Sequence, residues 1–303
     1  MFQSGVLAAT AMPHIRGLDN APVIPIADIP THSDYSKEEV QLRNQLASLY
    51  RLVDKFHWSQ AIFNHMTVRI HNDEGQEEIL INPFGFSYHE VTASSLVKVD
   101  LKGNIIDQGS TNNPINQAGY VLHSTIHKGR PDIQAVLHLH TPSVAAVSSM
   151  KCGLLPCCQE AMILGPVAYH EYQGIVVDDG DEERASLVSD LGDKNIMILR
   201  NHGFVVVGKT IQEAFIMMYH LILACETQVR ALSCGGVSEL HIPMKDAVYR
   251  AYCIANNGAG GVNREKNGCV RNDRWKIGEL EWQAWMRSLD SLGLRTGYNY
   301  RTI

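Results

Sequence analysis

The stretch NPINQAGYVLHSTIHKGRPDIQAVLHLHTPS, residues 113–143, decides the fold. Its first part, residues 117–128, has the pattern of a helix, and the turn sequence GRPD separates it from an alternating run over residues 133–140. In a strand, residues two apart point to the same face. His138 and His140 are therefore predicted to share one side of a strand, which is the direction that coordination of a single metal ion requires.

Capping patterns and apolar periodicity predict one long helix on either side of this stretch. Ser36 with Glu39, and Thr210 with Glu213, each match a capping box, in which a hydroxyl accepts from the backbone three residues on. Apolar residues then recur at three- and four-residue steps in both segments. Each segment is predicted to be an amphipathic helix that buries one face.

Four short runs, rich in β-branched and apolar residues, predict strands at residues 66–70, 78–83, 195–200 and 204–208. The first two are expected to form a hairpin. The last two bracket the tight turn Asn201-His202-Gly203. A histidine in such a turn has a side chain that is free to leave the sheet, so His202 is a third candidate ligand beside His138 and His140.

The pattern divides the chain into four parts. Residues 1–35 lack periodicity and are predicted to be an N-terminal extension, and residues 36–250 form the head domain. Residues 251–273 are rich in Gly and Asn and are predicted to be a flexible linker. Residues 274–303 contain an amphipathic helix with an aromatic stripe that needs a partner surface, either on its own domain or on another subunit.

Bulk composition limits the classes of function. The chain has 303 residues, is 45% hydrophobic and 19% charged, and carries a formal net charge of -6. These values describe a globular protein without the basic face of a nucleic-acid binder. The sequence contains no apolar window of about 18 residues, the length that would predict a membrane span. Seven cysteines without CxxC spacing indicate reduced thiols in a cytosolic protein.

The three histidines offer a metal-binding chemistry. Zinc and similar divalent ions bind imidazole nitrogen at about 2.0–2.1 Å, and a catalytic zinc site commonly has three protein ligands and one open position. His138, His140 and His202 are the predicted ligands of zinc or another divalent cation. The alternative is that these histidines are hydrogen-bonded in a polar pocket of the core without any ion.

Several separated motifs resemble the class II aldolase/adducin family, most closely the adducin head domain. They are RPDIQAVLHLHTPS (130–143), KCGLLP (151–156), YHEYQGI (169–175), LRNHGFVVVGKTIQEAF (199–215) and, where the adducin neck begins, WKIGELEWQAWMRSLDSLGLRTGYNYR (275–301). The resemblance implies a three-layer α/β/α sandwich around a mixed, largely antiparallel sheet. It also implies that the HxH pair and the histidine of the NHG turn correspond to the metal ligands of the family's enzymes.

The chain departs from those enzymes where they carry out proton transfer. They place a glutamate one helical turn before the helix histidine that His123 matches, and here that position is Gly119. Phe63 and Phe84 stand within the turns that bind phosphate in the aldolases. The resemblance therefore implies an inactive site with no catalytic residue, unless another acid enters it; the candidates are Glu90, Glu160 and Glu171.

The function that the resemblance implies is that of a non-catalytic scaffold in the spectrin-actin membrane skeleton. Its expected partners are actin, spectrin and other adducin-like subunits in a homo- or hetero-oligomer, with no nucleic acid. Its expected location is the cytoplasm, at the cytoskeleton and the cytoplasmic face of the plasma membrane, with peripheral membrane association. The alternative is a divalent-metal-dependent aldolase- or epimerase-like enzyme that acts on a small hydroxy-carbonyl substrate.

Overall fold

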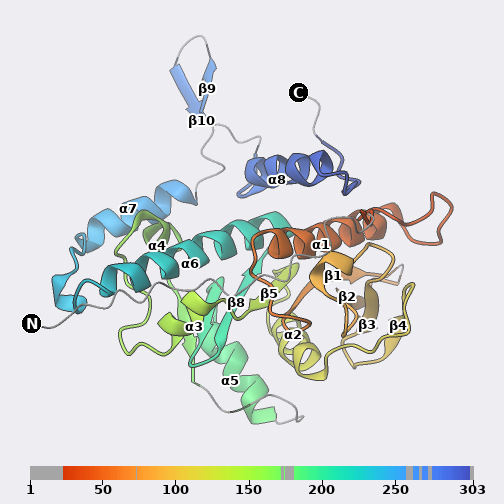
Figure 1. The fold of residues 1–303 in the computed structure, drawn as a ribbon, viewed down its shortest axis with the longest axis horizontal. Coiled ribbons are helices and arrows are strands. Elements are labelled where there is room, and N and C mark those ends of the chain that lie inside the picture. Colours follow the sequence, from red (N-terminus) through yellow and green to blue (C-terminus); the bar gives the residue numbers. More distant parts are fainter. Residues whose placement is uncertain are drawn as a thin grey trace, which may run out of the picture.

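An eight-stranded sheet forms the centre of the computed structural model, which describes residues 23–72, 74–171, 174, 181–256, 262–265, 268–271 and 275–300 (Figure 1). The strand order is β4-β3-β2-β1-β5-β8-β7-β6. The strands are β1 (His65–His71), β2 (Glu77–Ile81), β3 (Val97–Asp100), β4 (Ile105–Asp107), β5 (Ala135–Leu139), β6 (Ala168–His170), β7 (Ile196–Leu199) and β8 (Gly203–Gly208). Neighbours are antiparallel except β6 and β7, which are parallel.

Helices cover both faces of the sheet. On one face lie α1 (Lys37–Lys55) and α6 (Ile211–Leu232), and on the other lie α2 (Gln117–Gly129) and α5 (Asp181–Leu191) (Figure 1). This arrangement confirms the predicted α/β/α sandwich with a mixed, largely antiparallel sheet. The shorter helices are α3 (Pro142–Ser148), η1 (Tyr88–Glu90), α4 (Gln159–Ile163), η2 (Val237–Glu239) and α7 (Lys245–Ala255). Among the described residues, no helix has the length and apolar character needed to cross a membrane.

Local capping explains where the long helices begin. The Ser36 hydroxyl accepts a hydrogen bond from the Glu39 backbone at 3.1 Å, and the Thr210 hydroxyl accepts one from Glu213 at 3.1 Å. The side chain of Asn116 caps α2 in the same way, accepting from the Gly119 backbone at 3.0 Å. Each of these bonds satisfies one backbone donor that the first turn of a helix leaves without a partner.

The C-terminal helix α8 (Glu279–Ser291) packs against α1 and α6 of its own chain. Trp282 is fully buried, and the Trp285 ring meets the Phe215 ring edge to face at a centroid distance of 4.6 Å. The aromatic stripe was expected to pack either on its own domain or on another subunit, and in the structure it packs on its own domain. Aromatic pairs of this geometry contribute about 0.5–1.5 kcal/mol beyond the burial of their area.

Two parts of the chain outside the predicted head domain have structure that the sequence pattern did not indicate. Ile26 is fully buried, and its backbone N–H donates to the Leu294 carbonyl at 2.7 Å, so the head core includes a residue of the predicted extension; residues 1–22 lie outside the described residues. Within the predicted linker, β9 (Val262–Glu265) pairs with β10 (Gly268–Arg271). A short turn is enough to join two antiparallel strands, and runs of this length are too short for periodicity to reveal them.

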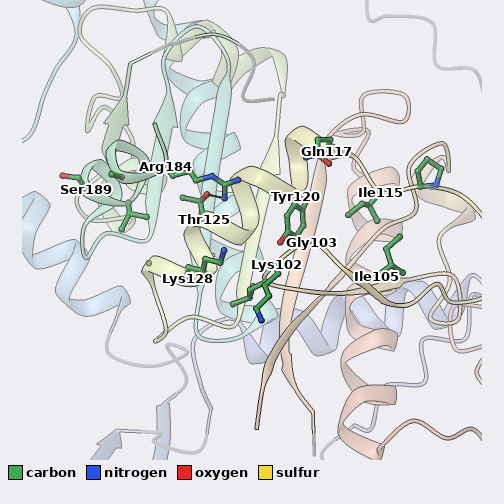
Figure 2. A pocket seen from close by; sticks show the side chains of 15 residues that line it. Lys102, Gly103, Ile105, Ile115, Gln117, Tyr120, Thr125, Lys128, Arg184 and Ser189 are labelled. Atoms are coloured by element: carbon green, nitrogen blue, oxygen red, sulfur yellow. Dashed lines mark hydrogen bonds between the residues drawn. The ribbon is translucent and has the colours of Figure 1, made fainter. Parts of the chain in front are cut away.

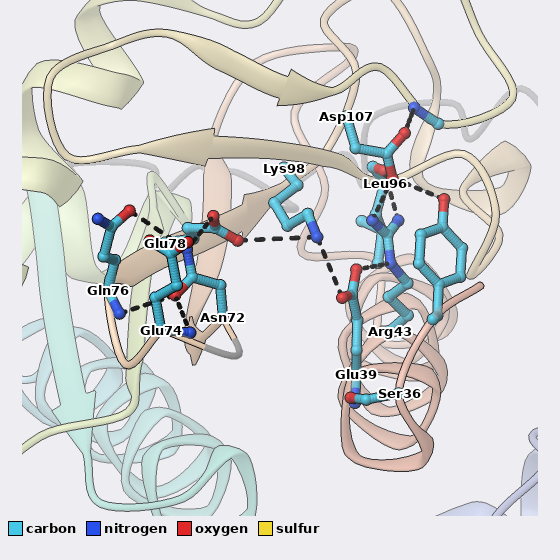
Figure 3. Close-up of polar contacts among 12 residues, drawn as sticks. Ser36, Glu39, Arg43, Asn72, Glu74, Gln76, Glu78, Leu96, Lys98 and Asp107 are labelled. Atoms are coloured by element: carbon cyan, nitrogen blue, oxygen red, sulfur yellow. Dashed lines mark hydrogen bonds and ion pairs between the residues drawn. The ribbon is translucent and has the colours of Figure 1, made fainter.

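A buried polar network ties α1 to the sheet edge (Figure 3). The Arg43 guanidinium is fully buried and donates to Glu39 at 2.8 Å, to Asp107 at 2.7 Å and to the Leu96 carbonyl at 2.7 Å. Lys98 adds an ion pair to Glu39 at 3.1 Å. A buried guanidinium is tolerated when its donors are matched by acceptors in this way. We call this set, together with the Leu96 carbonyl, the Arg43 network.

Candidate functional site

The structure brings together the three histidines predicted from the sequence. His138 lies in β5, His140 follows directly after that strand, and His202 lies in the turn between β7 and β8. Because β5 and β8 are antiparallel neighbours with Leu139 opposite Phe204, the end of one strand meets the turn that begins the other. The candidate ligand atoms of the three residues all lie within 4.8 Å of one another. We call this set the histidine triad.

Hydrogen bonds orient two of the triad rings toward a common point. The Nδ1–H of His138 donates to the Phe204 carbonyl at 2.9 Å, and Nδ1 of His140 lies 3.1 Å from the Gln60 side-chain oxygen. The Phe204 carbonyl fixes the His138 proton on Nδ1, and with the Gln60 oxygen as acceptor the His140 proton is also on Nδ1, the tautomer in which each Nε2 carries a lone pair. The two Nε2 atoms are 2.8 Å apart. In this tautomer the two lone pairs face each other, and a cation between them would be coordinated by both nitrogens.

Burial keeps the triad in the neutral form that a metal ion needs. It holds the pKa of His138 well below the usual value, helped by the positive charge that His65 and the other triad rings would carry. Burial, followed by the effect of His202, lowers the pKa of His140 to about 4. Burial also lowers the pKa of His202. At neutral pH the rings are therefore uncharged, with lone pairs available. The donor set and its orientation fit a divalent ion such as zinc.

The space beside Gly119 contains the ring of another histidine. A Cβ atom built on Gly119 would lie 2.5 Å from Nε2 of His65, closer than non-bonded atoms tolerate. His65 belongs to β1, is paired in register with His138, and stacks its ring on that of His138 at a centroid distance of 5.0 Å. The position where the aldolases carry a glutamate is thus occupied by an imidazole that comes from a neighbouring strand.

Behind His65 runs a chain of buried polar side chains that the sequence did not reveal. His65 Nδ1 lies 2.9 Å from His123 Nε2, His123 Nδ1 lies 2.6 Å from the Thr67 hydroxyl, and that hydroxyl lies 2.9 Å from His127 Nε2. Two sequence spacings could have identified it. His65 and Thr67 are two residues apart on β1, and His123 and His127 are four residues apart on α2, so each pair lies on one side of its element. These contacts hold the His65 ring against the triad.

None of the three carboxylates proposed as substitute acids joins the histidine triad among the described residues. Glu90 accepts from the Ser87 backbone at 2.8 Å and caps η1. Glu160 lies in α4, where its charge acts on His220 of α6. The Glu171 side chain is 85% exposed, and among the described residues its ion pair is a long one, at 3.9 Å, with Arg200.

The segments that correspond to the phosphate turns carry bulky rings. Phe63 and Phe84 face each other with centroids 6.5 Å apart, and Phe63 is 51% exposed. Binding of a phosphate group depends on a close approach of backbone N–H groups and hydroxyls. Two phenyl rings provide neither donor and obstruct that approach. The two rings therefore disfavour phosphate binding at these turns.

A mixed sheet between two helical layers, with three histidines gathered where β5 ends, defines a class II aldolase-like domain. Residues 44–229 match the family model described as Class II Aldolase and Adducin N-terminal domain. The chain belongs to this family, and the resemblance seen in its sequence motifs is confirmed.

Two relatives and one solved structure show how far the similarity extends. "Adducin-related protein 1" of Caenorhabditis elegans is 48% identical over 278 residues, which are 92% of this chain and 36% of that protein. Alpha-adducin of Rattus norvegicus is 50% identical over 268 residues, or 88% of this chain and 35% of that protein. An aldolase II superfamily protein from Pseudomonas syringae has a TM-score of 0.75 at 40% identity, covering 86% of this chain and 97% of that chain. The chain thus spans little more than a third of either adducin relative.

Proposed function

We propose that this chain is a non-catalytic, adducin-like scaffold of the membrane skeleton. Its identity of 48% to an adducin-related protein and of 50% to an alpha-adducin supports the adducin-like role. The proposal that catalysis is lost rests on the position of the His65 ring, which fills the volume that a side chain at position 119 would need. A site with three ligand imidazoles and no carboxylate beside them can hold an ion but lacks the glutamate that transfers the proton in the family's enzymes.

The partners we assign to this scaffold are spectrin, actin and other adducin-like subunits in a homo- or hetero-oligomer. Its location is the cytoplasm, at the cytoskeleton on the cytoplasmic face of the plasma membrane, with a peripheral membrane association. Support for these assignments comes from the likeness of the head domain to the adducin relatives. It also comes from the sequence after residue 274, which resembles the junction of an adducin head and neck.

Within the scaffold, His138, His140 and His202 are proposed to hold zinc or another divalent ion as a structural tie. The ion would join the end of β5 to the turn between β7 and β8, two segments that are far apart in the sequence. The converging Nε2 atoms and the outer hydrogen bonds to Phe204 and Gln60 support this role. Sites of this kind contribute directly to folding stability.

Co-sedimentation tests the scaffold. The purified chain is centrifuged alone, with actin filaments, with filaments and spectrin, and with both together with full-length alpha-adducin. We expect the chain to pellet in at least the last mixture. A His140→Ala variant should pellet to the same extent, because binding of partners does not use triad chemistry. If the chain stays in the supernatant in every mixture, the scaffold proposal is wrong.

One observation, the converging lone pairs of the triad, favours a second function, a divalent-metal lyase or epimerase for a small hydroxy-carbonyl compound. A bound ion would polarise the carbonyl group and stabilise an enediolate. Metal content and turnover of a panel of such compounds are measured for the wild type, for His138→Ala and for His241→Ala, an exposed control. We expect metal in all but His138→Ala and turnover in none. Turnover that disappears only in His138→Ala would replace the scaffold with an enzyme.

A further inference from the structure

A broad groove opens on the side of the molecule that carries α2 and α5 (Figure 2). It has a volume of 1210 Å³ and reaches from α5 across α2 to the turn between β3 and β4. Two close contacts fix its floor. A Cβ at Gly129 would lie 2.5 Å from Val188, so α2 and α5 touch there, and the Tyr120 hydroxyl donates to the Asp100 carbonyl at 3.2 Å. The groove is therefore preformed by packed elements.

The charged side chains that line the groove are all basic. They are Lys102, Lys128 and Arg184, and none of the described residues lining it carries a carboxylate (Figure 2). Lys102 and Lys128 are exposed and have no ion pair within the described part of the chain. The side chain of Arg184 lies 3.4 Å from the Thr125 hydroxyl, which positions it at the groove wall. In a chain with a net charge of -6, this lining forms a local site for negative charge.

The groove also presents apolar surface beside an open sheet edge. Ile105, on β4, is 46% exposed and lines the groove together with Leu101 and Ile115. Because β4 is the last strand of the sheet in the described part of the chain, one side of its backbone has no neighbouring strand there. An edge strand with an exposed apolar side chain is suited to pairing with an extended segment of another chain.

Size and shape distinguish between the ligands that basic residues attract. Pockets for small molecules typically have volumes of about 300–1,000 Å³ and enclose their ligand, whereas this groove is larger and open along its length. A membrane presents a nearly flat layer of head groups, which would touch the rims of a concave groove but not its floor. A narrow, extended chain can reach both.

We propose that this groove binds an extended acidic segment of a partner protein. The carboxylates of the segment would pair with Lys102 and Lys128, and its apolar side chains would pack on Ile105 at the edge of β4. The site lies on the opposite face of the sheet from α1 and α6 and uses no member of the histidine triad. It therefore stands independently of the scaffold proposal.

Fluorescence anisotropy with a labelled peptide tests the groove. The probe is a twelve-residue peptide of alternating Glu and Val, and the control probe has Lys in place of Glu. The full chain is compared with the double variant Lys102→Glu/Lys128→Glu. A matched control, Lys37→Glu/Lys151→Glu, makes the same charge change at two exposed lysines outside the groove. We expect saturable binding of the acidic probe, weakened at least tenfold by the groove variant and by 0.5 M salt, and unchanged in the control variant.

Four results would overturn the proposal. One is no binding of the acidic probe, and another is equal weakening by both pairs of substitutions, which would indicate only a general effect of net charge. The third is binding to phosphatidylserine vesicles that is lost in the groove variant while the peptide does not bind, which would assign the surface to a membrane. Circular dichroism and the mass in solution are recorded for each variant. If the groove variant dissociates an oligomer without changing peptide binding, the groove is an interface between copies and the proposal fails.

Discussion

The Arg43 network and the histidine triad are both dense clusters of titratable groups at the sheet, yet they differ in how their atoms are paired. In the Arg43 network, donors point at acceptors: Arg43 reaches Glu39 and Asp107 at 2.8 and 2.7 Å. In the triad, the Nε2 atoms of His138 and His140 face each other at 2.8 Å, and in the tautomer that carries both protons on Nδ1 their lone pairs converge. A cluster whose donors are matched by its own acceptors stabilises the fold, whereas a cluster whose lone pairs converge is suited to binding a cation.

The largest effect should come from breaking the Arg43 network. Arg43→Met would remove the buried guanidinium from the partly buried carboxylates of Glu39 and Asp107 and leave Asp107 without its cation, which costs about 3 kcal/mol of unfolding free energy, the lower end of the range for a buried pair. Urea unfolding followed by circular dichroism measures this difference. Arg230→Met is the control, because the Arg230 side chain is 80% exposed and its ion pair to Glu226 is long at 3.7 Å; it should change stability by less than about 0.5 kcal/mol. Similar losses in both variants would mean that the network is not a structural tie.

Zinc should stabilise the protein through the histidine triad and not through the Arg43 network. Addition of zinc at one hundred times its dissociation constant would stabilise the wild type by about 2.7 kcal/mol, because the ion binds only the folded triad. Thermal unfolding with and without zinc measures the shift. His202→Ala should lose the zinc-dependent shift, and His241→Ala should keep it. A shift that survives in His202→Ala would place the ion elsewhere.

Acid should affect the chain of polar side chains behind the triad. Burial, followed by the charge of Arg69, lowers the pKa of His127 to about 3, below the value near 6.5 expected in the unfolded chain. Between these values the unfolded state binds the proton and the folded state does not, so stability falls as the pH falls. From pH 6.5 to 5 the loss from this residue is about 2 kcal/mol.

Urea unfolding at pH 7, 6 and 5 measures this slope in the wild type and in His127→Gln. The variant should lose less stability than the wild type as the solution is acidified, although its stability at pH 7 is lower. His241→Gln, at an exposed position, should show the slope of the wild type. Parallel slopes in all three proteins would contradict the assigned pKa.

The smallest effect should come from one methyl group. In a helix, Gly→Ala usually adds about 1 kcal/mol of stability, but the Cβ of Gly119→Ala would press on the His65 ring at a cost of about 1–3 kcal/mol. The net result expected is a loss of about 1 kcal/mol. In a His65→Ala background the same substitution should stabilise instead, and a double-mutant cycle measures the change of sign. A stabilising Gly119→Ala in the wild type would show that His65 moves aside freely.

The histidine triad could be predicted from the sequence because its parts are local patterns. The alternation of His138 and His140 and the turn around His202 indicate direction and accessibility, and the family motifs indicate that the two segments meet. Arg43 and Asp107, by contrast, are 64 positions apart, and no periodicity connects them. The sequence shows that position 119 lacks the carboxylate of the aldolases, but it does not show that the His65 ring of β1 fills the space beside Gly119. Long-range packing determined that occupant, and only the structure reveals it.

The interlocking of His65 and Gly119 restricts how this domain could change over time. A glutamate introduced first at position 119 would collide with the ring, and removal of the ring first would open a void and leave Nε2 of His123 without its hydrogen-bond partner. Either order passes through a less stable intermediate. A descendant of this chain would need both exchanges together to gain a carboxylate at that position, so its absence is hard to reverse by single substitutions.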